Sequence, residues 1–169
     1  MPVDHLTEDQ LGAIVRSLLP AWPSEGCGLV LADKDGHLRV HPCANVADAL
    51  HAEAPATFPR TSRTAFAIAP RELLLADLRG DAIHLIYHSH CDARDELSAE
   101  DRRVATLGLG ESAGPAWPGR DQLVVSIVGG RPVRASHYRY DDATRRFERI
   151  DVYGDLERFA EGGLTPARR

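Results

Sequence analysis

Four residues in one short stretch of the sequence are of types that bind metal and activate water. His88 and His90 are separated by one serine, and Ser98 and Asp101 follow after seven further residues. Neutral imidazole nitrogens and a carboxylate oxygen are ordinary zinc ligands, and three protein ligands leave a fourth position open to water. Zinc lowers the pKa of the water it holds, which gives a usable nucleophile at neutral pH. The spacing therefore predicts a three-ligand zinc site of the hydrolytic kind.

The elements around these residues can bring them together. Residues 82–88 are rich in β-branched and aromatic types and predict a buried strand. Because alternate residues of a strand share a face, His88 and His90 should project to the same side. Ser98 is expected at the N-cap of a helix, with Asp101 in its first turn. A carboxylate in that turn can face back toward a metal at the strand end.

Each residue also has an interpretation without catalysis. Ser98 and Asp101 fit a plain capping box, which only begins a helix. A single histidine such as His88 is more often a core residue than a ligand. The complete set of four is much harder to obtain by chance, and this favours the metal site.

The motif resembles that of the JAMM (MPN-plus) zinc metalloproteases, in which two histidines precede a serine and an aspartate, here His88-Ser89-His90-x7-Ser98-x2-Asp101. That family also has an upstream glutamate in a Glu-x-x-Gly setting before a strand, and Glu25-Gly26-Cys27-Gly28 matches it. The resemblance runs over about residues 6–153, and residues 85–90 are especially similar to small free-standing bacterial members. Cys91 and Leu97 stand where many or some relatives carry proline, and neither change removes a ligand.

The resemblance implies a role for each residue of the motif. His88, His90 and Asp101 would bind one Zn²⁺ ion per chain. Glu25 would take a proton from water and later protonate the leaving amine, and Ser98 would hydrogen-bond the oxygen of the tetrahedral intermediate. The small bacterial relatives act on ubiquitin-like or sulfur-carrier proteins. The implied substrate is therefore a β-grasp protein that is cleaved after its C-terminal Gly-Gly.

Several alternatives stay open at this point. The bond could be a linear peptide bond, or an isopeptide bond cut by a deconjugating enzyme of a bacterial ubiquitin-like defence system. A non-catalytic MPN-type binding scaffold is a second class, although silent relatives lack parts of the motif that this chain keeps. A structural zinc site is a third, but such sites are usually closed by four protein ligands. Cys91 as a fourth ligand would revive that interpretation.

The substrate's tail is expected to lie extended beside the sheet as an added strand. The loops at 91–97 and 108–120 flank the motif helix at its two ends. We expect one or both loops to border the groove that holds the tail.

Composition and charge narrow the class of protein. The chain has 169 residues and a formal net charge of −5, and it contains no basic run, so we expect no nucleic-acid partner. No apolar stretch approaches the roughly 20 residues that a membrane span needs. Residues 1–5 lack the basic and apolar regions of a secretory signal, so a cytoplasmic protein is expected.

The three cysteines do not form a recognisable framework. Cys27, Cys43 and Cys91 are an odd number without a Cys-x-x-Cys pair, which excludes a disulfide scaffold and a cysteine-based zinc site. Cys27 precedes an apolar strand and is expected to be a buried small residue. Cys91 adjoins His90 and could be a free loop thiol, a reactive thiol or a fourth metal ligand.

The order of the predicted elements indicates a mixed α/β (α+β) fold, with a curved mixed β-sheet flanked by helices in one JAMM/MPN-like domain. Helices are predicted from the capping box at Thr7 to just before Pro20, over 70–79 and from Ser98 onward. Residues 44–62 are expected to be loop. The domain should span residues 1–154, with a flexible tail at 155–169. The predicted strands are 27–32, 38–40, 64–68, 82–88, 122–128, 133–140 and 147–153.

Overall fold

One six-stranded mixed sheet forms the centre of the computed structural model, which describes residues 5–160. The strand order is β2-β1-β3-β4-β5-β6; β3 and β4 run parallel, and the other neighbours are antiparallel. The mixed α/β architecture expected from the sequence is confirmed. The strands are β1 (Cys27–Ala32), β2 (Leu38–Cys43), β3 (Ala82–Cys91), β4 (Asp121–Val128), β5 (Arg131–Asp141) and β6 (Arg146–Tyr153).

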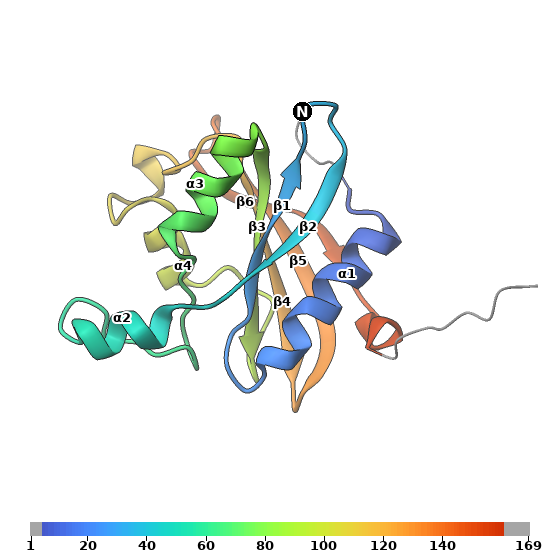
Figure 1. The fold of residues 1–169 in the computed structure, drawn as a ribbon, viewed down its shortest axis with the longest axis horizontal. Coiled ribbons are helices and arrows are strands. Elements are labelled where there is room, and N and C mark those ends of the chain that lie inside the picture. The colour runs from blue at the N-terminus through green and yellow to red at the C-terminus, as the bar shows by residue number, and fades with distance from the viewer. Residues whose placement is uncertain (1–4, 161–169) are drawn as a thin grey trace, which may run out of the picture.

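The helices lie on both faces of this sheet. Figure 1 shows α1 on one side, and α2, α3 and α4 together on the other. Among residues 5–160, no helix has the length and apolar character needed to cross a membrane. The α-helices are α1 (Glu8–Leu18), α2 (Ala47–Glu53), α3 (Pro70–Arg79) and α4 (Ala99–Ala105), and the short 3-10 turns are η1 (Leu19–Ala21), η2 (Glu111–Ala113) and η3 (Leu156–Phe159).

The first helix forms where the sequence predicts it. The Thr7 hydroxyl accepts the N–H of Gln10 at 3.2 Å, and the Gln10 side chain accepts the N–H of Thr7 at 2.9 Å. This capping box satisfies backbone donors that the helix itself leaves free. The apolar side of α1 then packs on the sheet through four buried residues, Leu11, Ile14, Val15 and Leu18.

A close approach between β1 and β3 shapes this face of the sheet. Tyr87 of β3 is completely buried, and its hydroxyl lies 3.1 Å from the Ser17 hydroxyl of α1. Gly28 is the residue of β1 that pairs with Tyr87. A Cβ atom on Gly28 would overlap the Tyr87 hydroxyl, so the tyrosine can lie across the strand only because this residue is glycine.

The opposite face holds two apolar clusters that position the helices near the motif. Ala76 of α3 packs against Leu29, Leu31 and Ile86 of the sheet. The second cluster joins α4 and the residue before its cap to β4, β5 and β6, and consists of Leu97, Ala105, Val124, Tyr138 and Phe147. Both motif elements, β3 and α4, therefore rest on packed core.

The expectation that residues 44–62 are only loop is wrong, because they include α2. This helix spans seven residues, and Ala47 is the residue in it that is buried. The side chain of Asn45 accepts the Ala47 N–H at 3.0 Å and so begins the helix. A helix with one buried position leaves no apolar periodicity to recognise.

The predicted strand at 64–68 is also wrong. Only a single antiparallel bridge forms, between Asn45 and Ile68. The Asn45 amide donates to the Ala65 carbonyl at 2.9 Å, and its oxygen accepts the Ala67 N–H at 3.0 Å. The Asn45 side chain therefore hydrogen-bonds the backbone groups of Ala65 and Ala67 that would otherwise pair with a neighbouring strand.

Packed structure extends past residue 154, where the sequence suggested that the domain ends. Leu156 of η3 is completely buried in the cluster under α1. Arg158 forms an ion pair with Glu8 at 2.7 Å. Residues 155–160 thus belong to the domain, and the rest of the expected tail, 161–169, lies outside the described residues.

Candidate metal centre

The two motif histidines meet at the end of β3, on the face opposite α1. Their Nε2 atoms lie 3.2 Å apart, and His88 is completely buried while His90 is 8% exposed. Asp101 of α4 faces both rings: Oδ1 lies 3.4 Å from His88 Nε2, and Oδ2 lies 3.1 Å from His90 Nε2. The three residues that the sequence singled out as ligands are therefore brought together.

These distances fit a metal ion among the three atoms. Zinc–nitrogen and zinc–oxygen bonds of about 2.0–2.1 Å in a tetrahedral site place neighbouring ligand atoms about 3.3 Å apart. The separations here fall between 3.1 and 3.4 Å. Two imidazoles and one carboxylate are also an ordinary donor set for zinc.

The surroundings of the two rings orient them differently. His90 donates its Nδ1 hydrogen to the Arg94 carbonyl at 2.7 Å, which leaves the lone pair of Nε2 directed at Asp101 and His88. His88 stacks on Phe66 with ring centroids 4.2 Å apart. The Nδ1 atom of His88 is buried and has no hydrogen-bond partner among residues 5–160. Packing against Phe66 therefore holds the orientation of His88.

A capping box directs Asp101 at the histidines. The Ser98 N–H donates to Asp101 Oδ2 at 2.8 Å, and the Asp101 N–H donates to the Ser98 hydroxyl at 3.1 Å. The same Oδ2 atom faces His90. Ser98 and Asp101 thus form the helix cap and also fit the ligand cluster, because the cap fixes the carboxylate that faces the two rings.

Burial and charge set the protonation of the cluster. Complete burial lowers the pKa of His88 and favours the neutral imidazole that a metal requires. Burial opposes ionisation of Asp101, but its interaction with His88, with hydrogen bonds from His90 and Ser98, holds the pKa of this carboxyl well below its usual range. Asp101 is therefore a carboxylate at neutral pH.

Glu25 lies in the turn before β1, within electrostatic range of the cluster. It is 6% exposed, and its backbone is held by the Ser62 carbonyl, which accepts its N–H at 2.7 Å, and by Asn45, which donates to its carbonyl at 2.8 Å. Burial, helped by the charge of Asp101 and opposed by His90 and Arg60, raises the pKa of Glu25 to about 7. A carboxyl with this pKa can both accept and donate a proton near neutral pH.

The Ser98 hydroxyl is engaged as the N-cap of α4, where it accepts the Asp101 N–H. A hydroxyl that accepts one hydrogen bond can still donate its own proton. Ser98 can therefore serve as both a cap and a donor beside the cluster.

Cys91 stands apart from the group of ligand atoms. In this part of the described structure, the ligand atoms that lie together are those of His88, His90 and Asp101, and the Cys91 thiol is not among them. The Cys91 thiol donates to the Ser24 carbonyl at 3.1 Å, and burial raises its pKa. The geometry gives a three-ligand cluster in which this thiol takes no part.

An apolar cavity of about 270 Å³ opens beside Asp101. Trp117, from the loop at 108–120, lines it, and the loop at 91–97 contributes none of the lining residues. The latter loop is instead fastened to the sheet: Asp95 is buried and accepts the Ser136 hydroxyl at 2.6 Å. Other apolar lining residues are Phe58, Phe66, Ile68, Leu73 and Val104.

A small polar network behind Glu25 was not predicted from the sequence. Asp48 of α2 accepts the N–H and the hydroxyl of Ser62, each at 2.7 Å, and the Ser62 hydroxyl also bonds the Ser24 hydroxyl at 3.0 Å. With Asn45, this network holds the segment that places Glu25. These residues occupy a stretch without hydrophobic periodicity, and no motif of their own marks them.

Comparisons with known proteins agree with this arrangement. A family model described as prokaryotic homologs of the JAB domain matches residues 7–141. The solution structure of a Desulfitobacterium hafniense protein is similar, with a TM-score of 0.57 and 25% identity, over 85% of this chain and 86% of that one. A Salinibacter ruber protein gives a TM-score of 0.54 and 25% identity, over 86% and 87% of the two chains. Among curated proteins, none matches this chain.

Proposed function

The chain belongs to the family of prokaryotic homologs of the JAB domain, and we propose that it is a zinc-dependent hydrolase. The bond cleaved is a peptide or isopeptide bond after the C-terminal Gly-Gly of a ubiquitin-like or sulfur-carrier β-grasp protein. One observation carries the proposal: two imidazole nitrogens and a carboxylate lie at zinc-ligand spacing, with a second, buried carboxyl group nearby. A purely structural zinc site has no use for that second group.

Each residue has a distinct part in the proposed reaction. His88, His90 and Asp101 hold the zinc ion, which supplies Lewis acidity and a water-derived nucleophile at neutral pH when it is bound. Glu25 accepts the proton from water and returns it to the leaving amine. The Ser98 hydroxyl donates a hydrogen bond to the carbonyl oxygen as negative charge develops there.

The shape of the site supports a substrate that arrives as a narrow tail. The ligand cluster is largely buried, so little room remains around the scissile bond, and glycine is the residue with no side chain to accommodate. The cavity beside Asp101 has an apolar lining that includes Phe66 and Trp117. An apolar side chain upstream of the two glycines would fit there.

Cleavage of defined substrates tests the proposal. The full chain, loaded with zinc, is incubated with β-grasp proteins extended past Gly-Gly by a linear peptide or through a lysine isopeptide bond. We expect cleavage after the second glycine, and the two substrates distinguish a processing peptidase from a deconjugating enzyme. Replacement of either glycine by leucine should lower cleavage strongly.

Variants separate the proposed roles. Glu25→Gln should keep zinc and lose nearly all hydrolysis, because it removes the proton acceptor and not a ligand. His88→Ala should lose both zinc and activity. A folded, zinc-loaded wild type that cleaves neither substrate would contradict the proposal and favour a non-catalytic binding domain. Equal cleavage of peptides without Gly-Gly would point to a general peptidase.

A further inference from the structure

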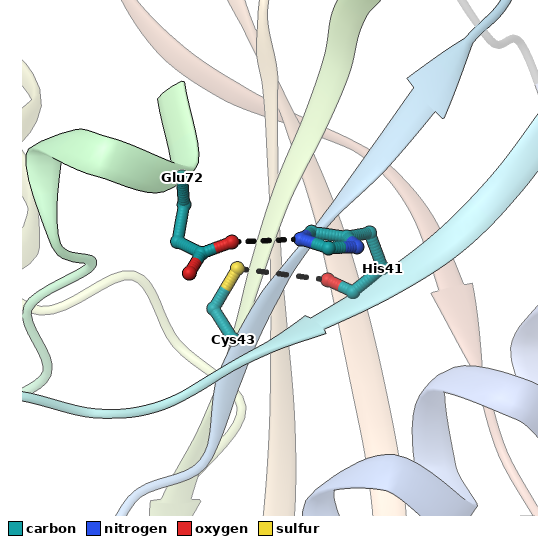
Figure 2. A group of neighbouring side chains, drawn as sticks. All are labelled: His41, Cys43 and Glu72. Atoms are coloured by element: carbon teal, nitrogen blue, oxygen red, sulfur yellow. Dashed lines mark hydrogen bonds and ion pairs between the residues drawn. The ribbon is translucent and has the colours of Figure 1, made fainter. Parts of the chain in front are cut away.

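Three other ligand-type side chains meet between β2 and α3, away from the motif. Figure 2 shows His41 and Cys43 of β2 and Glu72 of α3 pointing toward one another. His41 Nε2 lies 3.0 Å from Glu72 Oε2, and the Cys43 thiol donates to the His41 carbonyl in a long contact of 3.7 Å. One ligand atom from each of the three residues lies within 4.8 Å of the other two.

We propose that His41, Cys43 and Glu72 form a second metal site, which takes a zinc-type divalent ion. The site is separate from the three-ligand cluster of His88, His90 and Asp101 and does not depend on hydrolysis by it. Its donors are one imidazole nitrogen, one thiolate sulfur and one carboxylate oxygen. Zinc accepts all three of these donors, whereas calcium and magnesium favour oxygen alone.

The second site repeats the construction of the first. In each, two ligands occupy alternate positions of one strand, and the third is a carboxylate at the third position of a helix. His41 and Cys43 are the strand pair here, and Glu72 follows Pro70 and Arg71 in α3, as Asp101 occupies the third position of α4. This arrangement of strand and helix brings a carboxylate back over a strand end.

The two sites lie on the same face of the sheet. Cys43 pairs with Cys27, and Cys27 pairs with His88, so the three residues lie in register across β2, β1 and β3. Adjacent strands are about 4.8 Å apart, which puts the Cα atoms of Cys43 and His88 about 10 Å apart. The second site is thus a neighbour of the first, one strand removed.

Bond lengths indicate how far the ligands must move. In a tetrahedral zinc site, ligand atoms are about 3.3–3.6 Å apart, given Zn–N and Zn–O bonds of about 2.0–2.1 Å and a Zn–S bond of about 2.3 Å. The His41–Glu72 distance of 3.0 Å is already close to this range. Cys43 must turn inward by rotation of its side chain, and its long contact with a carbonyl does little to prevent this. Solvent can reach the site, because the side chains of His41 and Glu72 are 27% and 18% exposed.

Without metal, His41 and Glu72 are joined by a hydrogen bond beside a free thiol. Arg71 also approaches Glu72, with its Nε atom 3.5 Å from Oε1. This arginine is exposed, and it pairs with the carboxylate oxygen that does not face His41. It therefore leaves Oε2 available to a metal ion.

A bound ion would fasten α3 to the edge of the sheet. This helix buries only Ala76 fully among its residues and leaves Leu74, Leu75 and Leu78 exposed. The helix leads directly through Gly80 into β3. Metal binding at Glu72 would stabilise the segment that precedes the motif strand, because an ion that binds only the folded chain favours folding.

Cobalt titration of the full chain tests the second site. A thiolate bound to Co²⁺ gives an intense near-ultraviolet charge-transfer band, which nitrogen and oxygen ligands do not give. The ligand cluster of the first site contains no sulfur, so the band reports the second site. We expect two equivalents of metal per chain in the wild type, with the thiolate band present, and a rise in Tm when zinc is added to protein with one equivalent bound.

Matched variants identify the ligands. Cys43→Ala should abolish the thiolate band and leave one equivalent of bound metal. Glu72→Gln is a second variant, which tests the site even if Cys43→Ala folds poorly, and it should weaken the second binding step by at least tenfold. Cys91→Ser is the control for the thiol near the first site, and His5→Ala is the control for a surface histidine outside any ligand cluster of residues 5–160; both should keep two equivalents and the band. Binding of one equivalent by the wild type, or a band that depends on Cys91, would overturn the proposal.

Discussion

Gly26 and Ser89 exchange two hydrogen bonds: the Gly26 N–H donates to the Ser89 hydroxyl at 2.8 Å, and the Ser89 N–H donates to the Gly26 carbonyl at 3.0 Å. Ser89 is the residue between the two motif histidines, and its side chain points away from them. Gly26 directly follows Glu25. The pair therefore ties the segment that carries Glu25 to the strand that carries the candidate metal ligands.

Replacing Ser89 by alanine should misplace Glu25 without removing a ligand. Ser89 is completely buried, so the Gly26 N–H would lose its partner, at a cost of about 1–3 kcal/mol in the free energy of unfolding. We expect a lower kcat with unchanged zinc content, measured by elemental analysis and single-turnover cleavage. Ser17→Ala, which removes a hydroxyl that contacts Tyr87 and not Gly26, is the control and should keep kcat. Loss of zinc from the Ser89 variant would show that the pair supports the ligands instead.

Gly28→Ala should destabilise the fold through one contact. The new Cβ atom would overlap the hydroxyl of Tyr87, and overpacking of this kind costs about 1–3 kcal/mol. Urea unfolding measures the loss. Gly154→Ala is the matched control, because a Cβ atom there meets nothing within 4 Å. A Gly28 variant as stable as the control would mean that Tyr87 can move aside freely.

Asp121→Ala should lower the free energy of unfolding more than the removal of an exposed carboxylate does. Asp121 of β4 is 3% exposed and accepts from His137 Nε2 at 2.8 Å and from Arg139 Nη2 at 2.9 Å. Breaking a buried charge pair costs about 3–5 kcal/mol. Glu8→Ala breaks the exposed pair with Arg158 and should cost at most about 1 kcal/mol. Equal losses in thermal unfolding would contradict the assignment of Asp121 as a structural anchor.

Trp117→Ala should weaken binding of the substrate's tail and spare the chemistry. Trp117 lines the cavity beside Asp101, so its removal should raise KM several-fold with little change in kcat. Leu109 lies in the same loop and is 73% exposed, which makes Leu109→Ala a control that should leave KM unchanged. An unchanged KM in the Trp117 variant would exclude the cavity from substrate binding.

Much of the candidate site could be predicted because it depends on local geometry. Alternate residues of a strand share a face, which places His88 and His90 together. The capping box places Asp101 in the first helical turn after Ser98. Both rules act over a few residues. The spacing therefore predicts the cluster before any tertiary contact is known.

The parts that could not be predicted depend on contacts between distant segments. Asn45 makes four hydrogen bonds to backbone groups of other residues, and these replace the expected strand at 64–68 and begin an unexpected helix. In the sequence, Gly28 is an ordinary glycine of a predicted strand, and its close contact with Tyr87 is visible only in the structure. An asparagine or a glycine has no pattern in sequence that reveals which distant group it meets.

The position of β3 within the sheet limits the shape of any molecule that reaches the motif histidines. At His88 this strand is paired with Cys27 of β1 on one side and Val124 of β4 on the other, so the expected added strand cannot pair with its backbone at that residue. Contact with the side chains of His88 and His90 must come from above the sheet, on the face that carries Asp101 of α4. Both histidines are buried, so a chain end that projects from its own fold can approach them more readily than the convex surface of a folded domain. Under the proposed hydrolysis, this burial alone would spare compact proteins that lack a projecting chain end.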